Sequence, residues 1–142
     1  MKLLERYAVV SNGLQTAFVA QALEEESPRK ALIRTLDALD YERDEYDTPR
    51  IAAVVERGKE KGWLGFVGRD ELWVRSVKLV EGKAFFTATY NVDGVEGGLE
   101  LSFSKAGELA ENVLKLDFAH PVLAIGGVVE DGGEKWDVAV RP

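Results

Sequence analysis

The sequence has no cysteine and a single histidine, His120, among its 142 residues. Without thiols, the chain forms no disulfide bond, no thiolate metal site and no cysteine nucleophile. One imidazole cannot build a histidine-rich metal centre. His120 precedes Pro121 and an apolar, strand-like run, so a structural hydrogen bond at a strand edge is favoured over a place in a Ser-His-Asp triad.

Basic residues are also scarce, because 18 lysines and arginines face 25 acidic residues and the net charge is −7. Nucleic-acid-binding proteins normally present a basic face, so this charge argues against such a partner. A nucleotide-sized anion needs only a few local arginines. No apolar run approaches the length of a membrane span, and the N-terminus carries no signal-peptide pattern. We therefore expect a cytoplasmic protein with neither a nucleic-acid nor a membrane partner.

Repeats, low-complexity segments and linkers are missing too. With 46% hydrophobic and 30% charged residues, the composition is typical of a globular protein with a sizeable core. We expect a single domain over residues 1–142.

The first third of the sequence is predicted to hold one strand and two helices. Residues 7–10 form a short apolar run, and residues 15–25 suit a helix. Ser27 and Pro28 are a helix start signal, with Ser as N-cap and Pro at the first helical position, so a second helix is expected over 28–39. The residues considered for the inner face of the first helix are Phe18, Val19, Ala22 and Leu23.

After Pro49 the hydrophobic period changes from about 3.6 to about 2. Strand-like runs follow at residues 51–55, 63–67, 72–79, 83–91, 99–103, 121–129 and 135–140, with one helix-like run at 105–116. The continuous, β-branched run 51–55 is predicted as a central strand. Because helices and strands occur in blocks rather than in alternation, the sequence predicts an α+β fold with mostly antiparallel sheets.

The most informative stretch is Asp40-Tyr41-Glu42-Arg43-Asp44-Glu45-Tyr46-Asp47-Thr48-Pro49-Arg50. It holds five carboxylates, two phenols and two guanidiniums in eleven residues. One interpretation is a solvated connection, with a surface ion pair between Asp40 and Arg43 and a helix stop at Pro49. The other is a functional loop, in which the acids form a proton-transfer site and Thr-Pro-Arg forms an anion site.

Two further motifs have both a functional and a structural interpretation. Ser11-Asn12-Gly13 is a polar turn after a strand, where Gly lets a ligand approach the backbone and Asn can orient an amide or ribose; it also suits a plain strand-to-helix turn. The pair Gly126-Gly127 indicates a bulge or a close backbone approach, since it lacks the spacing of a dinucleotide-binding loop. Trp63, Phe66 and Trp73 are explained most simply as core residues.

Several of these runs together resemble the archaeal-type IMP cyclohydrolase family. The resemblance rests on Val9-Val10-Ser11-Asn12-Gly13 with Gln15-Thr16, on residues 36–44, and above all on the acidic run through Thr48-Pro49-Arg50. Ala88-Thr89-Tyr90 and Asp117-Phe118-Ala119-His120 are similar to the family's C-terminal half. The resemblance covers nearly the whole chain, and it favours the functional interpretation of the acidic run.

The resemblance implies a layered αββα fold of the N-terminal-nucleophile-hydrolase (Ntn-hydrolase) type. It also implies a reaction, ring closure of 5-formamidoimidazole-4-carboxamide ribotide to IMP with loss of water, and no cofactor or metal. The fold name does not bring that superfamily's chemistry, because residue 2 is Lys and no N-terminal Ser, Thr or Cys is present to act as nucleophile.

Three residues are the predicted catalytic groups, Glu42, Asp44 and Tyr46. A carboxylate suits proton transfer, so Glu42 is the first candidate and Asp44 the second. Tyr46 is expected to stack on the imidazole or to donate a proton. Four residues are predicted to bind the substrate: Asn12, Gly13, Thr48 and Arg50. Among these, Arg50 is expected to hold the phosphate or the developing oxyanion, and Asn12 to orient the carboxamide.

One departure from the family pattern shapes the remaining expectations. Family members have a segment before the equivalent of Tyr7, with a Ser-Arg-Ser-Phe-Pro-Asn-Arg-like motif and an Asn-Pro-Tyr-like motif. This chain starts at Met1-Lys2-Leu3-Leu4 and has neither. The fold is therefore expected to be incomplete at the N-terminus, and the chain to form a homo-oligomer or to join a chain that supplies the segment. The alternatives to a full enzyme are a purine-ribotide binding module, one piece of a two-chain enzyme, and a bare scaffold.

Overall fold

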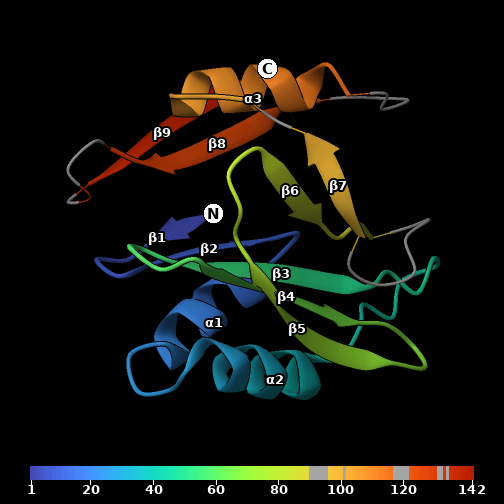
Figure 1. The fold of residues 1–142 in the computed structure, drawn as a ribbon. Helices are drawn as coiled ribbons and strands as arrows, with labels where there is room; N and C mark the ends of the chain where they lie inside the picture. Colours follow the sequence, from blue (N-terminus) through green and yellow to red (C-terminus); the bar gives the residue numbers. More distant parts are fainter. Residues whose placement is uncertain (90–95, 101, 117–121, 131–132, 134) are drawn as a thin grey trace. The chain divides into compact units, whose positions relative to one another are not determined.

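The computed structural model describes residues 1–89, 96–100, 102–116, 122–130, 133 and 135–142 (Figure 1). The chain divides into two compact units, Met1–Gly98 and Leu99–Pro142. The single domain expected from the length stays a prediction. In the described part of the chain, no helix has the length and apolar character needed to cross a membrane.

A five-stranded antiparallel sheet is the centre of the first unit. Its strands are β1 (Lys2–Leu3), β2 (Tyr7–Ser11), β3 (Arg50–Glu56), β4 (Lys61–Val67) and β5 (Leu72–Lys78). They pair in the order of the sequence, so β3 is the central strand, as predicted. The short strand β1 was not predicted, because two residues carry no periodic signal.

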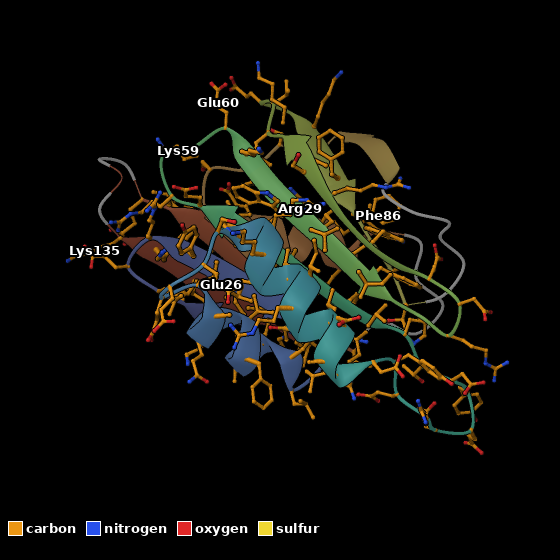
Figure 2. All side chains as sticks on the ribbon, turned by 90° about the horizontal axis from the view of Figure 1, so that it is seen from below. Glu26, Arg29, Lys59, Glu60, Phe86 and Lys135 are labelled. Carbon is orange, nitrogen blue, oxygen red and sulfur yellow. The ribbon has the colours of Figure 1, made fainter. Side chains whose placement is uncertain are left out.

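Two helices cover one face of this sheet (Figure 1). They are α1 (Gln15–Ala22) and α2 (Pro28–Leu39). The bounds of α2 confirm the prediction from Ser27 and Pro28, which occupy the N-cap and the first turn. Figure 2 looks onto the helices with the sheet behind them, and Arg29 lies exposed near the start of α2.

The core of the first unit lies between these helices and the sheet. Val9, Val54 and Leu32 are fully buried there. Two fully buried residues of α2, Leu32 and Leu36, approach Gly65 of β4, where an added Cβ would lie 2.7 Å from Leu36 Cδ1. The absence of a side chain at Gly65 thus gives the helix room to pack closely on the sheet.

The inner face of α1 differs from the expectation. Val19 and Leu23 are buried, but Phe18 is 49% exposed and so does not belong to the core. The buried position in the first turn is instead taken by Gln15. Hydrophobicity alone favoured Phe18, whereas the helix turns a polar side chain toward the sheet because that side chain finds hydrogen-bond partners there.

The predicted core aromatics are only partly buried. Trp63 and Phe66 are buried, while Trp73 is half-buried on β5. Phe66 and Trp73 are paired across β4 and β5, and their rings stack with centroids 5.5 Å apart. This is the cross-strand aromatic contact that stabilises neighbouring strands.

The remaining elements are two small sheets and one helix. They are β6 (Lys83–Phe86), which pairs with β7 (Glu96–Glu100), then α3 (Ala106–Leu114), β8 (Ala124–Val129) and β9 (Trp136–Arg141). The final hairpin β8–β9 confirms the expectation. The strand predicted at 99–103 is displaced to Glu96–Glu100, and His120 lies outside the described residues. The whole is an α+β structure in which the strand pairs with a described register are antiparallel.

Close backbone approach explains Gly126. A Cβ at this position of β8 would lie 2.2 Å from the carbonyl oxygen of Ala106, in the first turn of α3. Asp137 of β9 completes the contact, since its Oδ2 accepts a hydrogen bond of 2.8 Å from the backbone N–H of Ala106. The helix therefore lies directly on the hairpin, with glycine and alanine at the contact.

We predict that Gly126→Ala destabilises the chain, because the new methyl group meets backbone atoms that cannot rotate away. Overpacking of this kind lowers the free energy of unfolding by about 1–3 kcal/mol. Urea denaturation monitored by circular dichroism measures this change. Gly62→Ala is the matched control, since the nearest atom to its Cβ is 3.4 Å away, in the flexible side chain of Leu79. Equal unfolding midpoints for the two variants would contradict the packing argument.

Candidate active site at the end of the first sheet

The turn after β2 and the loop before β3 meet at one end of the five-stranded sheet, and Asn12 joins them. Its Nδ2 donates to the carbonyl oxygen of Pro49 at 2.9 Å, and its Oδ1 accepts from the backbone N–H of Ile51 at 3.0 Å. The last backbone pair of β2 and β3 is Ser11 with Ala52. The side chain of Asn12 therefore continues the ladder beyond the point where the two backbones separate.

Arg50, the first residue of β3, is the buried cation of the site, with 9% of its surface exposed. Its Nε donates to the carbonyl oxygen of Asp40 at 2.9 Å, and its Nη1 donates to Glu42 Oε1 at 2.5 Å. A buried charge is tolerated only with such partners. Within the described part of the chain, Nη2 donates no hydrogen bond, so one end of the guanidinium is left for an outside acceptor.

Gly13 lies directly against this ion pair. A Cβ at Gly13 would lie 2.8 Å from Gln15 Oε1, 3.5 Å from Arg50 Nη1 and 3.6 Å from Glu42 Oε1. Three side chains thus converge on one point, and Gly13 has no side chain of its own that would cover the guanidinium and the carboxylate there.

Asp40 ends α2 with an unusual backbone conformation, φ 58° and ψ −176°. This region of the Ramachandran map is occupied almost only by glycine, and strain of this kind costs on the order of 1–3 kcal/mol. The conformation turns the carbonyl of Asp40 onto Arg50 Nε. Its carboxylate accepts from the N–H of Tyr41 and from Arg43, and these bonds lower the pKa of Asp40.

Asp44 closes the acidic loop onto itself. Its carboxylate accepts from Tyr46 N at 3.1 Å, from Thr48 N at 2.9 Å and from Thr48 Oγ1 at 2.6 Å. These three donors favour the charged form, so they hold the pKa of Asp44 below its ordinary value, with the hydroxyl of Thr48 as the largest cause. The N–H of Glu42 donates to the carbonyl oxygen of Thr48 at 2.8 Å, which ties the closed loop to the ion pair.

The predicted site residues therefore fall into two groups. Asn12, Gly13, Glu42 and Arg50 meet at the end of the sheet. Asp44 and Thr48 bond to each other within the loop, and Tyr46 is 69% exposed. The roles assigned to these seven residues stay predictions.

Two contributors were missed by reasoning from the sequence. One is the carbonyl of Asp40, which no side-chain pattern can reveal. The other is Gln15, whose amide contacts both Asn12 and Arg50. A glutamine in line with Val19 on a helix was the available signal, because a polar residue on an apolar face requires a buried partner.

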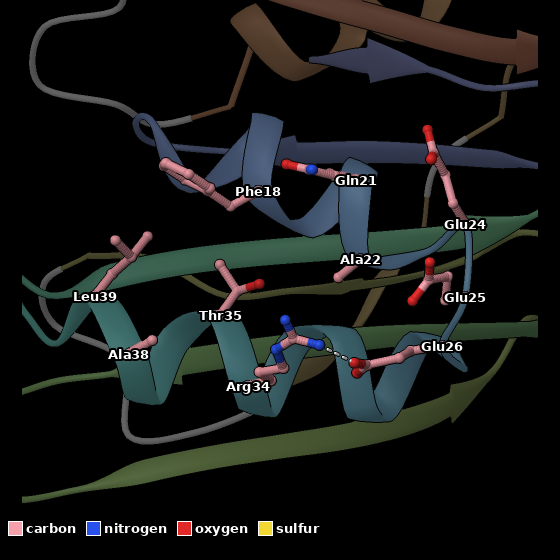
Figure 3. Close-up of a pocket in the computed structure, with 10 residues that line it drawn as sticks. All are labelled: Phe18, Gln21, Ala22, Glu24, Glu25, Glu26, Arg34, Thr35, Ala38 and Leu39. Atoms are coloured by element: carbon pink, nitrogen blue, oxygen red, sulfur yellow. Dashed lines mark hydrogen bonds and ion pairs between the residues drawn. The ribbon is translucent and has the colours of Figure 1, made fainter.

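A cavity of about 390 Å³ lies elsewhere in the first unit, between α1 and α2 (Figure 3). Phe18 and Leu39 lie at one end of it, and an ion pair between Arg34 and Glu26 lies along α2. None of the seven predicted site residues is among the described residues that line it. In the described ranges, no cluster of three or more His, Cys, Asp or Glu side chains is placed to hold a metal ion.

Comparison with known proteins identifies the family. A family model described as IMP cyclohydrolase-like protein matches residues 1–134. The chain belongs to this family. The matched region includes the whole of the site described above, all of the first compact unit and the second unit up to residue 134.

Individual members of the IMP cyclohydrolase-like family agree with this match. The chain is 59% identical to the IMP cyclohydrolase of Thermococcus kodakarensis over 142 residues, which are 100% of this chain and 70% of the relative. It is 33% identical to that of Methanocaldococcus jannaschii over 138 residues, 95% of this chain and 67% of the relative. It is 42% identical to the IMP cyclohydrolase of Natronomonas pharaonis over 127 residues, which are 89% of this chain and 62% of the relative. The relatives are thus longer than the chain.

We predict that the N–H signals of Tyr46 and Thr48 in NMR spectra follow the titration of Asp44. Because the folded loop lowers the pKa of Asp44, the midpoint falls below about 3.9, the usual value for aspartate. The loop's hydrogen bonds to the carboxylate are fully present above that value and are lost as the pH falls through the folded pKa. Glu45→Gln, in the same loop, should leave the midpoint unchanged. A midpoint above the usual aspartate value would refute this account of the loop.

Proposed function

We propose that this chain acts as an IMP cyclohydrolase, which converts 5-formamidoimidazole-4-carboxamide ribotide to IMP and water. The proposal is supported by relatives of that name that are similar to the chain over all or most of its length. The observation that carries it is the buried guanidinium of Arg50. This guanidinium carries a fixed positive charge and has an Nη2 left for an outside acceptor. It lies next to the carboxylate of Glu42 and to Gly13, which has no side chain.

Positioning is the first task of such a site. The carboxamide nitrogen of the substrate attacks the formyl carbon of the same molecule, so holding the two groups together supplies much of the acceleration. Arg50 suits this task, because its Nε is fixed by the carbonyl of Asp40. We infer that its outer edge binds the ribotide phosphate or the oxyanion that develops on the formyl oxygen.

Proton transfer is the second task, and we assign it to Glu42. One hydrogen leaves the carboxamide nitrogen, one leaves the formamide nitrogen, and both end on the oxygen that departs as water. A carboxylate next to Gly13 can accept one proton and return it to the departing oxygen. A ligand anion that binds Arg50 competes with Glu42 for the guanidinium, so substrate binding itself would release the carboxylate for this role.

The other predicted residues receive supporting roles. Asn12 has one amide hydrogen that no described group accepts, which suits orientation of the carboxamide. The lowered pKa of Asp44 keeps it charged at neutral pH, and its three hydrogen bonds support a loop-holding role rather than proton donation. The hydroxyl of Thr48 donates one of these three hydrogen bonds and so helps to hold the loop. Tyr46 is exposed and suits stacking on the imidazole.

We further propose the Ntn-hydrolase type of αββα layering and a cytoplasmic location. The layering is supported by the placement of the helices. In the first unit α1 and α2 pack on one face of the sheet, and in the second unit α3 packs on one face of its hairpin. Each unit keeps apolar residues on the other face, such as Val10 in the first and Val140 in the second. A reaction on a soluble ribotide is consistent with the cytoplasm.

The proposal is tested by assaying IMP formation from the formamido ribotide. Glu42→Gln is expected to lower kcat/KM by about a hundredfold or more, because it removes the proton acceptor and leaves the size of the side chain unchanged. Glu45→Gln, an exposed acid of the same loop, is the matched control and should stay within about threefold of the unchanged chain. A folded Glu42→Gln variant with unchanged kcat/KM would exclude Glu42 as the proton shuttle. Ribotide binding without turnover would identify a binding module.

We predict that the activity depends on association. Val10, on the face of the first sheet opposite α1 and α2, is 47% exposed, and exposed apolar side chains favour association with a second copy or another chain. Turnover per chain is expected to be weaker by about tenfold or more at concentrations where the chain is monomeric. The check is analytical ultracentrifugation combined with the assay. Full turnover by a monodisperse monomer would contradict this prediction.

A further inference from the structure

Gln15 is a fully buried polar side chain in the first turn of α1. An amide removed from water is costly unless its hydrogen bonds are replaced within the protein. Gln15 therefore marks a place where the fold has built partners for a glutamine. Two of these partners, Asn12 and Arg50, belong to the candidate site, and the third is the carbonyl of Ile51 next to it.

The two ends of the Gln15 amide have different partners. Nε2 donates to Asn12 Oδ1 at 2.6 Å and to the carbonyl oxygen of Ile51 at 3.1 Å. Oε1 accepts from Arg50 Nη1 over a longer distance, 3.4 Å. The donor end thus links α1 to the turn and to β3, whereas the acceptor end faces the guanidinium.

The contact with Arg50 matters because its other side-chain partner is exposed. The side chain of Glu42 is 39% exposed, so it can move away from Arg50 when it takes a proton or when a ligand anion replaces it. Gln15 is buried and fixed by its own donors, and therefore cannot follow. When Glu42 moves, the carbonyl of Asp40 and Oε1 of Gln15 are the described groups that still orient the guanidinium.

We propose that Gln15 is a positioning residue that holds Arg50 in its ligand-binding orientation through Oε1. The effect of Gln15 on turnover rests on the proposed function, whereas its contact with Arg50 does not. It separates two roles of one side chain: the Nε2 donors serve the fold, and the Oε1 acceptor serves the site.

Two substitutions separate these roles. Gln15→Leu removes both ends of the amide. Gln15→Glu keeps an acceptor for Arg50 but removes the donors to Asn12 and Ile51. Thr35→Val is the control for a buried polar group replaced elsewhere in the first unit, since Thr35 is buried on α2 away from Arg50.

The first measurement needs no enzymatic activity. In ¹⁵N NMR spectra of the full chain, the Nε–H of Arg50 is expected to exchange with solvent about tenfold faster in Gln15→Leu and to stay within about threefold in Gln15→Glu and Thr35→Val. Titration with inorganic phosphate should show weakened binding in Gln15→Leu and unchanged binding in Thr35→Val, whereas the added negative charge of Gln15→Glu weakens phosphate binding by repulsion and is not used in this titration. Unchanged exchange and unchanged phosphate binding in Gln15→Leu would overturn the proposal, whatever reaction the protein performs.

The second measurement is kinetic. In the form that turns over the formamido ribotide, Gln15→Leu is expected to lower kcat by about tenfold, and Gln15→Glu to recover kcat to within about threefold while its added negative charge raises KM for the anionic ribotide. A merely structural glutamine gives a different pattern, because both variants lose the Nε2 donors and would then lose thermal stability and kcat together. If no form of the unchanged chain makes IMP, the proposed function fails, and the exchange and phosphate measurements still decide the role of Gln15.

Discussion

The positive charge of Arg50 is the constraint on which the site depends. A guanidinium that is 9% exposed must be surrounded by acceptors, and its partners come from three separate segments: the end of α2, the acidic loop and the first turn of α1. Each segment places one oxygen atom within hydrogen-bonding distance of the guanidinium. The charge of one side chain thus fixes the relative placement of a helix end, a loop and a helix start.

The surrounding structure compensates for the strain and burial that this arrangement requires. Asp40 adopts a conformation that costs on the order of 1–3 kcal/mol, and a charge-assisted hydrogen bond to Arg50 offsets a similar amount. Asn12 replaces missing backbone pairs where β2 and β3 separate. Because strain persists only where neighbouring contacts hold it, its presence beside the ion pair of Arg50 and Glu42 supports a functional interpretation of the loop.

The sequence was sufficient for most of the helices and strands, with β1 and the bounds of β7 as exceptions, and for half of the candidate site. Ser27 and Pro28 predicted the start of α2 because capping and proline geometry are local properties. The continuous apolar run 51–55 predicted β3, in which Ala52 and Val54 are buried on one face and the alternate residues are half-buried on the other. The acidic run and the turn at Asn12 were recognised through their unusual chemistry and through the family resemblance.

The rest depended on tertiary contacts that no local pattern contains. Phe18 was wrongly considered for the core, because helical periodicity could not show that Gln15 would find partners at the end of β3. The carbonyl of Asp40 became part of the site only through the turn that ends α2. The three hydrogen bonds that Asp44 accepts within its own loop were likewise not visible in the sequence, and its role as the second candidate for proton transfer stays a prediction. Residues that resemble the family at Tyr90 and at 117–120 lie outside the described residues.

The most direct test of the central claim is to locate where this chain binds IMP, the product of the proposed reaction. In ¹H–¹⁵N NMR spectra titrated with IMP, the account predicts that the largest shifts occur at the backbone N–H groups of Asn12 and Gly13 and at the Nε–H of Arg50. Arg50→Leu should abolish those shifts. Shifts confined to Phe18 and the other residues of the cavity between α1 and α2, with none at Gly13 or Arg50, would contradict it.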